Sequence, residues 1–272
     1  MDELQEAIKR AIDQTRSAAR TRPTATRGSL VAIATDAQGF VEEARAALSD
    51  GGGGPRTERR LVAGALLVYA LDIAWSICHM LRTEPIKTHM VTLTLWRPLL
   101  ETWLRAAFFE VEATDDEVSA FRTAGTIPMR AWPSRPGNLV DLSPRLIAKL
   151  VAPTICPQEP ALIAALADEV KDWHGFVHGG DIIVELFDGG DTFEPQVGPD
   201  AMALKVQRVA VIAFLSGIVG ISLSSRERGD TELSPIALAL TRKIREFQER
   251  WPQHMFTAPA VSEPGIGAGR SK

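Results

Sequence analysis

The sequence predicts an all-α protein: a helical bundle with four long core helices, an N-terminal helical hairpin and a C-terminal helix. Two observations support this fold class. Apolar residues recur at three- and four-residue spacing over long segments, and clusters of glycine and proline separate these segments. Of the 272 residues, 45% are hydrophobic. A chain of this length and composition can therefore bury a sizeable core.

The expected elements follow from these patterns in chain order. Residues 1–50 are expected to form the N-terminal hairpin, and four glycines followed by Pro55 form a flexible linker after it. Residues 58–252 form the bundle domain, and residues 257–272 form a disordered tail by composition. The four long core helices are expected at 58–82, 87–112, 160–177 and 201–224. The smaller elements are expected to be a short helix at 143–151, a final helix at 233–251 and an irregular crossover at 125–136.

Charge and cysteine content exclude several classes of protein. The net charge of −4 and the sequence pI of about 5.8 argue against a surface built throughout for nucleic acid, although the basic stretch at 9–27 leaves local contact open. The two cysteines indicate neither a disulfide framework nor a cysteine zinc site.

The N-terminus lacks the apolar region of a secretory signal, so we expect a cytoplasmic protein. Asp72 interrupts one apolar helix and the other is short for a bilayer, so no stable membrane insertion is expected.

Three charged residues at four-residue spacing lie inside an otherwise apolar helix. Arg97, Glu101 and Arg105 share one helical face, where Glu101 can pair with either arginine. Pro98 frees one backbone carbonyl beside them. An arginine-lined kink of this kind can receive a phosphate or a carboxylate. The alternative is a buried network that only fixes helix packing.

Two histidines and one aspartate complete the set of candidate ligand-binding residues. His174 and His178 are one helical turn apart at a glycine-rich helix end, and His178 is the more accessible of the two by position. The H-G-F-V-H pattern lacks the glutamate of a zincin, so no metal site is assigned and no cofactor is expected. Asp72 is expected to meet Arg97 or Arg105 across the bundle.

The segments R-P-L-L-E-x-W-x-R-A-A-F-F at 97–109 and D-W-H-G-F-V-H-G-G-D at 172–181 resemble an uncharacterised bacterial helical family with R-P-x-x-E and x-H-x-G motifs. More distantly, the layout is similar to HEPN-like helical bundles of defence systems, some of which cut RNA. The resemblance implies a four-helix core, a homodimer and a polar site of Arg97, Glu101 and His178. The arginine and histidine spacing of HEPN ribonucleases does not fall inside a helix here.

These observations leave three hypotheses. The first is a HEPN-like defence or stress protein that binds a nucleotide or RNA at the polar centre, with phosphate-directed nuclease or hydrolase activity if it is an enzyme. The second is a non-catalytic interaction module that dimerises through its apolar helices and uses the polar centre structurally. The third is a metal-dependent hydrolase that uses His174 and His178.

Overall fold

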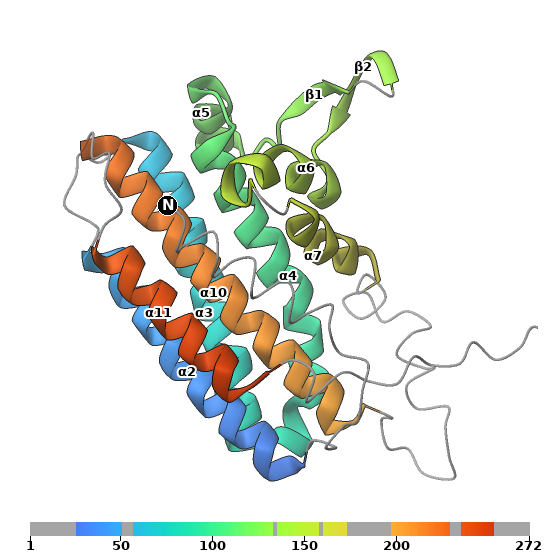
Figure 1. Cartoon of the computed structure of the whole chain (residues 1–272). Coiled ribbons are helices and arrows are strands. Elements are labelled where there is room, and N and C mark those ends of the chain that lie inside the picture. Colours follow the sequence, from blue (N-terminus) through green and yellow to red (C-terminus); the bar gives the residue numbers. More distant parts are fainter. Residues whose placement is uncertain are drawn as a thin grey trace, which may run out of the picture.

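In the computed structural model, the described residues are 26–50, 57–132, 135–157, 160–172, 197–228 and 235–252. They form a helical bundle with one small β-hairpin (Figure 1). The helices are α2 (Arg27–Asp50), α3 (Glu58–Thr83), α4 (Pro85–Val111), α5 (Asp115–Ala124), α6 (Pro144–Ile155), α7 (Ala161–Asp172), α10 (Pro199–Arg228) and α11 (Pro235–Arg250). The fold class predicted from the sequence is therefore confirmed.

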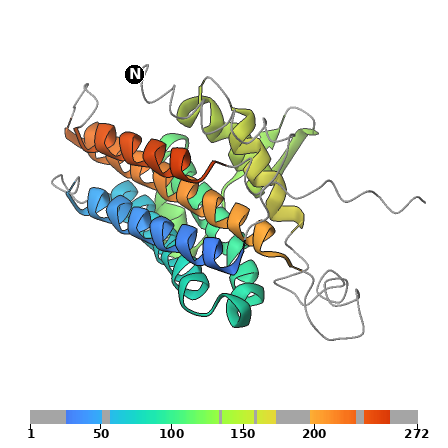
Figure 2. The same ribbon diagram turned by 60° about the horizontal axis from the view of Figure 1, so that its bottom comes forward.

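The long core helices are α2, α3, α4 and α10, which differs from the expected set. The helix expected at 160–177 corresponds to α7, which lies beside α4 and α6, and residues 173–177 lie outside the described residues. The fourth long helix is α2, whose apolar stripe is fully inside the core at Ile33, Ala37 and Ala44. Helix α2 packs against α3 and α10, so the core includes a helix that the sequence assigned to an N-terminal hairpin. Figure 2 shows α2, α10 and α11 running side by side.

Helices α3 and α4 form an antiparallel hairpin with a very short connection. Thr57 caps α3 by accepting a hydrogen bond from the Arg60 amide, and Glu84 separates the end of α3 from Pro85 at the start of α4. The start of α3 consequently lies beside the end of α4. This placement brings the N-terminal turn of one long helix to the C-terminal carbonyls of the other.

The expected irregular crossover at 125–136 contains a β-hairpin instead. Strand β1 (Met129–Trp132) pairs antiparallel with β2 (Arg135–Asp141), in a register that places Met129 opposite Asp141. The apolar alternation is too short to stand out in the sequence, and three prolines mask it. Helix α5 precedes the hairpin and opens with a capping box between Thr114 and Glu117.

Among the described residues, two helices are long and apolar enough to cross a membrane by length and composition alone. They are α3 and residues 199–226 of α10. In α10, 83% of the most apolar stretch is buried inside the bundle, as expected for a central helix, whereas in α3 only 50% is buried. Half of the most apolar stretch of α3 is therefore not buried in the bundle.

Candidate functional site

The arginine and glutamate ladder of α4 is present and paired. Arg97 donates from Nε to Oε1 of Glu101 over 2.7 Å, and Arg105 Nη2 lies 3.7 Å from Oε2 of the same carboxylate. Glu101 thus contacts both arginines, whereas the sequence predicted a pairing with either one. The Arg97 and Glu101 side chains are 22% and 19% exposed, and that of Arg105 is 40% exposed. The ladder is thus a half-buried ion-pair network along one helix.

The structure does not bring Asp72 to this network. Asp72 pairs with Arg45 of α2, and both side chains are about half exposed, at 47% and 49%. The expected pairing with Arg97 or Arg105 is wrong. Asp72 lies on the side of α3 that packs beside α2, so the arginine next to it is Arg45. It is not buried in the bundle.

The histidine part of the predicted site cannot be placed beside the ladder. His174 and His178 lie outside the described residues, as do residues 9–25 of the basic stretch at 9–27. Within the described part of the chain, no group of three or more His, Cys, Asp or Glu side chains is arranged to hold a metal ion. The described part of the predicted site is therefore Arg97, Glu101 and Arg105.

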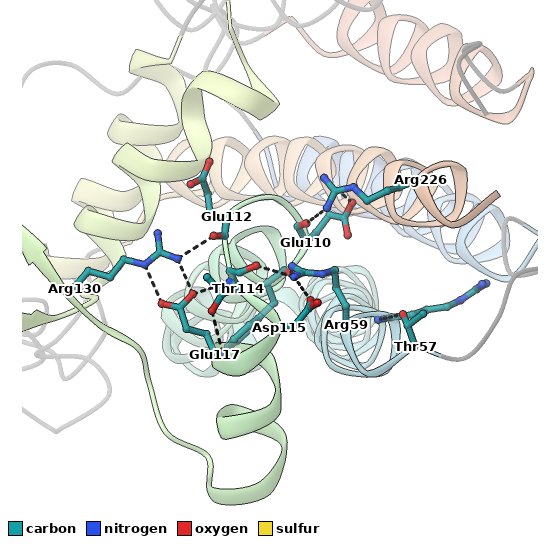
Figure 3. A network of polar contacts seen from close by, with 12 residues as sticks. Thr57, Arg59, Glu110, Glu112, Thr114, Asp115, Glu117, Arg130 and Arg226 are labelled. Carbon is teal, nitrogen blue, oxygen red and sulfur yellow. Dashed lines mark hydrogen bonds and ion pairs between the residues drawn. The ribbon is translucent and has the colours of Figure 1, made fainter. Parts of the chain in front are cut away.

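A second polar cluster, which the sequence did not indicate, lies at the C-terminal end of α4. Arg59, Arg130 and Arg226 come from α3, β1 and α10, and Figure 3 shows them reaching this end from different sides. The last carbonyls of a helix have no partner within the helix, and they carry the negative end of its dipole. Cationic donors at this position are therefore stabilising. We call these three residues the arginine clamp.

Each member of the clamp binds at least one main-chain carbonyl. Arg59 donates to the carbonyl of Phe109 over 2.5 Å and to that of Ala113 over 2.7 Å. Arg226 donates to the Glu110 carbonyl over 2.7 Å, and Arg130 donates to that of Glu112 over 2.9 Å. These pairs are separated by 50, 54, 116 and 18 residues in the chain. No local motif could have revealed them.

Two carboxylates complete the clamp. Glu110 is fully buried, and its carboxylate lies 3.6 Å from Arg226 and accepts a hydrogen bond of 3.4 Å from Ser222. Glu117 binds Arg130 with two short hydrogen bonds, of 2.6 and 2.9 Å. These contacts bind the arginines to α4 and α5, so the clamp braces the fold.

The hydrogen bonds from Arg130 lower the pKa of Glu117 below its ordinary value, and the Thr114 amide adds to this effect. A carboxyl with a lower pKa in the folded state stabilises the fold above its unfolded pKa, near 4.3. That contribution is lost as the pH falls through the folded pKa.

We therefore expect the Glu117→Gln variant to be less stable than the wild type at pH 6 and to approach it below about pH 4. Denaturant unfolding at a series of pH values measures the difference. In an Arg130→Met background, the same substitution should show a much weaker pH dependence. A difference between wild type and Glu117→Gln that is equal at pH 6 and pH 3 would contradict this assignment.

The most unusual surface lies on α3. Three large apolar side chains are exposed there, Leu61 at 52%, Val68 at 38% and Tyr69 at 57%. Together with Gly64 and Ala65 they recur at three- and four-residue spacing, which places them on one face of the helix. A helix that is apolar on all sides is normally buried on all sides. Within the part of the chain that the structure describes, the outer face of α3 is therefore an apolar surface that no other element covers.

A groove with a volume of about 770 Å³ follows this face. Its lining includes these apolar residues, the polar side chains of Thr57, Glu58, Arg60 and Arg122 towards the start of α3, and Asp72 at the other end. Glu58 pairs with Arg122 of α5, and Asp72 pairs with Arg45 of α2. The groove is thus apolar along its length and has an acid and a base at each end. We call this surface, from Glu58 to Asp72, the α3 face.

No family model, no curated protein and no solved structure matches this chain.

Proposed function

We propose that this protein is a non-catalytic interaction module whose docking surface is the α3 face. The observation that carries the proposal is the contiguous exposure of Leu61, Val68 and Tyr69 along the groove. A contiguous exposed apolar surface with a polar rim is typical of a protein interaction site. The single tyrosine of the chain is its most exposed member, and tyrosine is enriched at such sites.

The state of the polar groups supports a structural role for them. Glu101 is held between two arginines, and the clamp guanidinium groups donate to main-chain carbonyls and carboxylates. Groups that are already paired in this way lose those contacts when they bind a substrate. We infer that both polar clusters brace the helices so that the α3 face keeps its shape.

A photo-crosslinking experiment in cells tests the proposal. A photoreactive phenylalanine analogue replaces Tyr69 in the full chain, and the same analogue replaces Leu238 of α11 as the matched control. Leu238 is also an exposed apolar residue, at 42%, but it lies outside the α3 face. We expect a discrete crosslinked product from position 69 and none from position 238.

A further Ala65→Asp substitution is expected to abolish the product from position 69, because a charge in the centre of an apolar interface must be desolvated. Ala65 is exposed, so this substitution leaves the fold intact. Absence of a product from position 69, or equal products from both positions, would contradict the proposed function.

A second candidate function is binding of a nucleotide or RNA at the ladder of α4, as in HEPN-like bundles. It is favoured by one observation: α7 packs against α4, and the chain continues from α7 directly to His174. Fluorescence anisotropy with a labelled single-stranded RNA tests it. Arg97→Ala should weaken binding at least tenfold if the ladder binds phosphate, whereas Arg242→Ala on α11 should not. An RNA affinity that is undetectable or equal in both variants ends this candidate.

A further inference from the structure

We propose that the partner of the α3 face is a second copy of this chain, packed antiparallel across a two-fold axis at Ala65. This inference rests on the proposed function and names the occupant of the same surface. A two-fold interface requires a patch that is complementary to itself. The α3 face meets this requirement in its shape, its apolar residues and its charges.

The apolar residues are arranged symmetrically about Ala65. Leu61 lies four residues before it and Tyr69 four residues after it, so all three share one row on the helix surface. When a second α3 runs in the opposite direction, Leu61 of each copy meets the partner's Tyr69. Val68 and Gly64 flank this row on the same face. Both large exposed side chains of the row are thereby covered.

Each end of the face carries an acid that is balanced by an arginine. Glu58 and Asp72 lie seven residues on either side of Ala65, and each is paired with an arginine from another helix. Reversal places Glu58 of one copy opposite Asp72 of the other. The arginines already paired with them, Arg122 and Arg45, offset the charges of the two carboxylates. An unbalanced pair of like charges at either end would disfavour the interface.

The centre of the face permits close approach of two helices. Ala65 has a small side chain, and a Cβ added to Gly64 would meet no atom within 4 Å. Packed helix axes lie about 8–10 Å apart and Cα atoms lie about 2.3 Å from each axis, which places directly facing Cα atoms roughly 3.5–5.5 Å from each other. Residues at the crossing point are therefore within reach of a disulfide bond.

The length of the face argues against a lipid bilayer as its occupant. Acidic residues bound the apolar row at Glu58 and Asp72, 14 residues apart, which corresponds to about 21 Å of helix. The hydrocarbon core of a bilayer is about 30 Å thick. The opposite side of α3 is also packed in the core, at Leu67 and Leu71. A short apolar row bounded by ion pairs fits a second helix better.

Cysteine crosslinking of the purified full chain tests the orientation. The native Cys78 and Cys156 are both buried, so neither is exposed to a crosslinking partner, and burial also raises the pKa of the Cys78 thiol to about 12. Under mild oxidation, Ala65→Cys is expected to form a disulfide-linked dimer. Leu61→Cys and Tyr69→Cys should each remain largely monomeric alone but crosslink to each other when mixed. Leu238→Cys on α11 controls for random collision.

A parallel pair would instead crosslink Leu61→Cys to itself and Tyr69→Cys to itself, and this result would overturn the antiparallel arrangement. Failure of Ala65→Cys to exceed the Leu238→Cys control would overturn self-association through this face. The in-cell experiment at Tyr69 separates that failure from failure of the proposed function. A crosslinked product of another mass means that the face docks a different protein. No product at all means that it docks none.

Self-association also has an expected dependence on salt and on the central residue. Because ion pairs lie at both ends of the dimer interface, raising the ionic strength from about 0.05 to 0.5 M should weaken it several-fold. Ala65→Asp should weaken it at least tenfold without changing the circular dichroism spectrum. Vesicles of anionic phospholipid should not sediment the protein. Salt-independent association, an unaffected Ala65→Asp dimer or sedimentation with vesicles would each overturn the proposal.

Discussion

Replacement of Arg59 by methionine is expected to lower the free energy of unfolding by about 3 kcal/mol. A hydrogen bond to a charged group contributes about 1.5–3 kcal/mol, and a buried carbonyl left without a partner costs about 1–3 kcal/mol. Arg59 donates hydrogen bonds to the carbonyls of both Phe109 and Ala113. Its side chain is only 18% exposed, so water replaces these bonds poorly. The ion pair with Asp115 adds little, because that carboxylate is 95% exposed.

Urea denaturation of the variant measures this loss, and Arg242→Met provides the matched control. Arg242 is 71% exposed and lies 4.0 Å from Glu246, so its replacement should change stability by no more than about 0.5 kcal/mol. Arg59→Lys keeps the charge but has a single donor group, and it should lose part of the stability. Equal stability of Arg59→Met and Arg242→Met would show that the clamp does not brace α4.

The second large effect is expected at Gly220, where α10 crosses α2. A Cβ at this position would lie 1.8 Å from Cδ2 and 3.1 Å from Cγ of Leu48. Leu48 packs against the core, so its side chain or the helix must shift. Overpacking of this kind typically costs 1–3 kcal/mol. Gly220→Ala should therefore destabilise the protein by about 2 kcal/mol, although alanine is the better helix former.

Gly39 in α2 offers the matched control, because a Cβ there meets no atom within 4 Å. In this open position Gly39→Ala should stabilise the protein by about 0.5–1 kcal/mol, through helix propensity alone. Thermal denaturation of the two variants is then expected to shift in opposite directions. A stabilised Gly220→Ala variant would mean that α2 and α10 are not in close contact at Leu48.

The parts of the fold that depend on local patterns could be predicted from the sequence. Apolar periodicity located α3, α4, α10 and α11. Four-residue spacing predicted that Glu101 can pair with either Arg97 or Arg105, and it contacts both. Such contacts lie within one or two turns of a helix. They follow from the helical repeat and need no knowledge of tertiary packing.

Contacts between distant segments could not be predicted in this way. Asp72 was expected to pair with an arginine of α4, yet its partner is Arg45 of α2. The packing of the helices determines which arginine lies beside Asp72. The clamp was missed since its arginines lie up to 116 residues from the carbonyls they bind. An arginine at the start of α3, where the helix dipole disfavours it, is the one signal that could have pointed to such a role.

The α3 face was missed for a different reason. The hydropathy of α3 shows that the helix is apolar, but it does not show which side of the helix packs inside the bundle. Only the positions of α2, α4 and α10 around α3 show that Leu61 and Tyr69 remain outside. The apparent excess of apolar residues in α3 is explained if its outer side, the α3 face, is covered by another chain.

The most direct test of this account is the molar mass of the purified full chain, measured by sedimentation velocity over a concentration series. The α3 face predicts a reversible shift from the 29.6 kDa chain to twice that mass as the concentration rises, and an Ala65→Asp variant that stays at 29.6 kDa over the same range. A wild-type chain that remains monomeric throughout, or an Ala65→Asp variant that dimerises as the wild type does, would contradict self-association through α3.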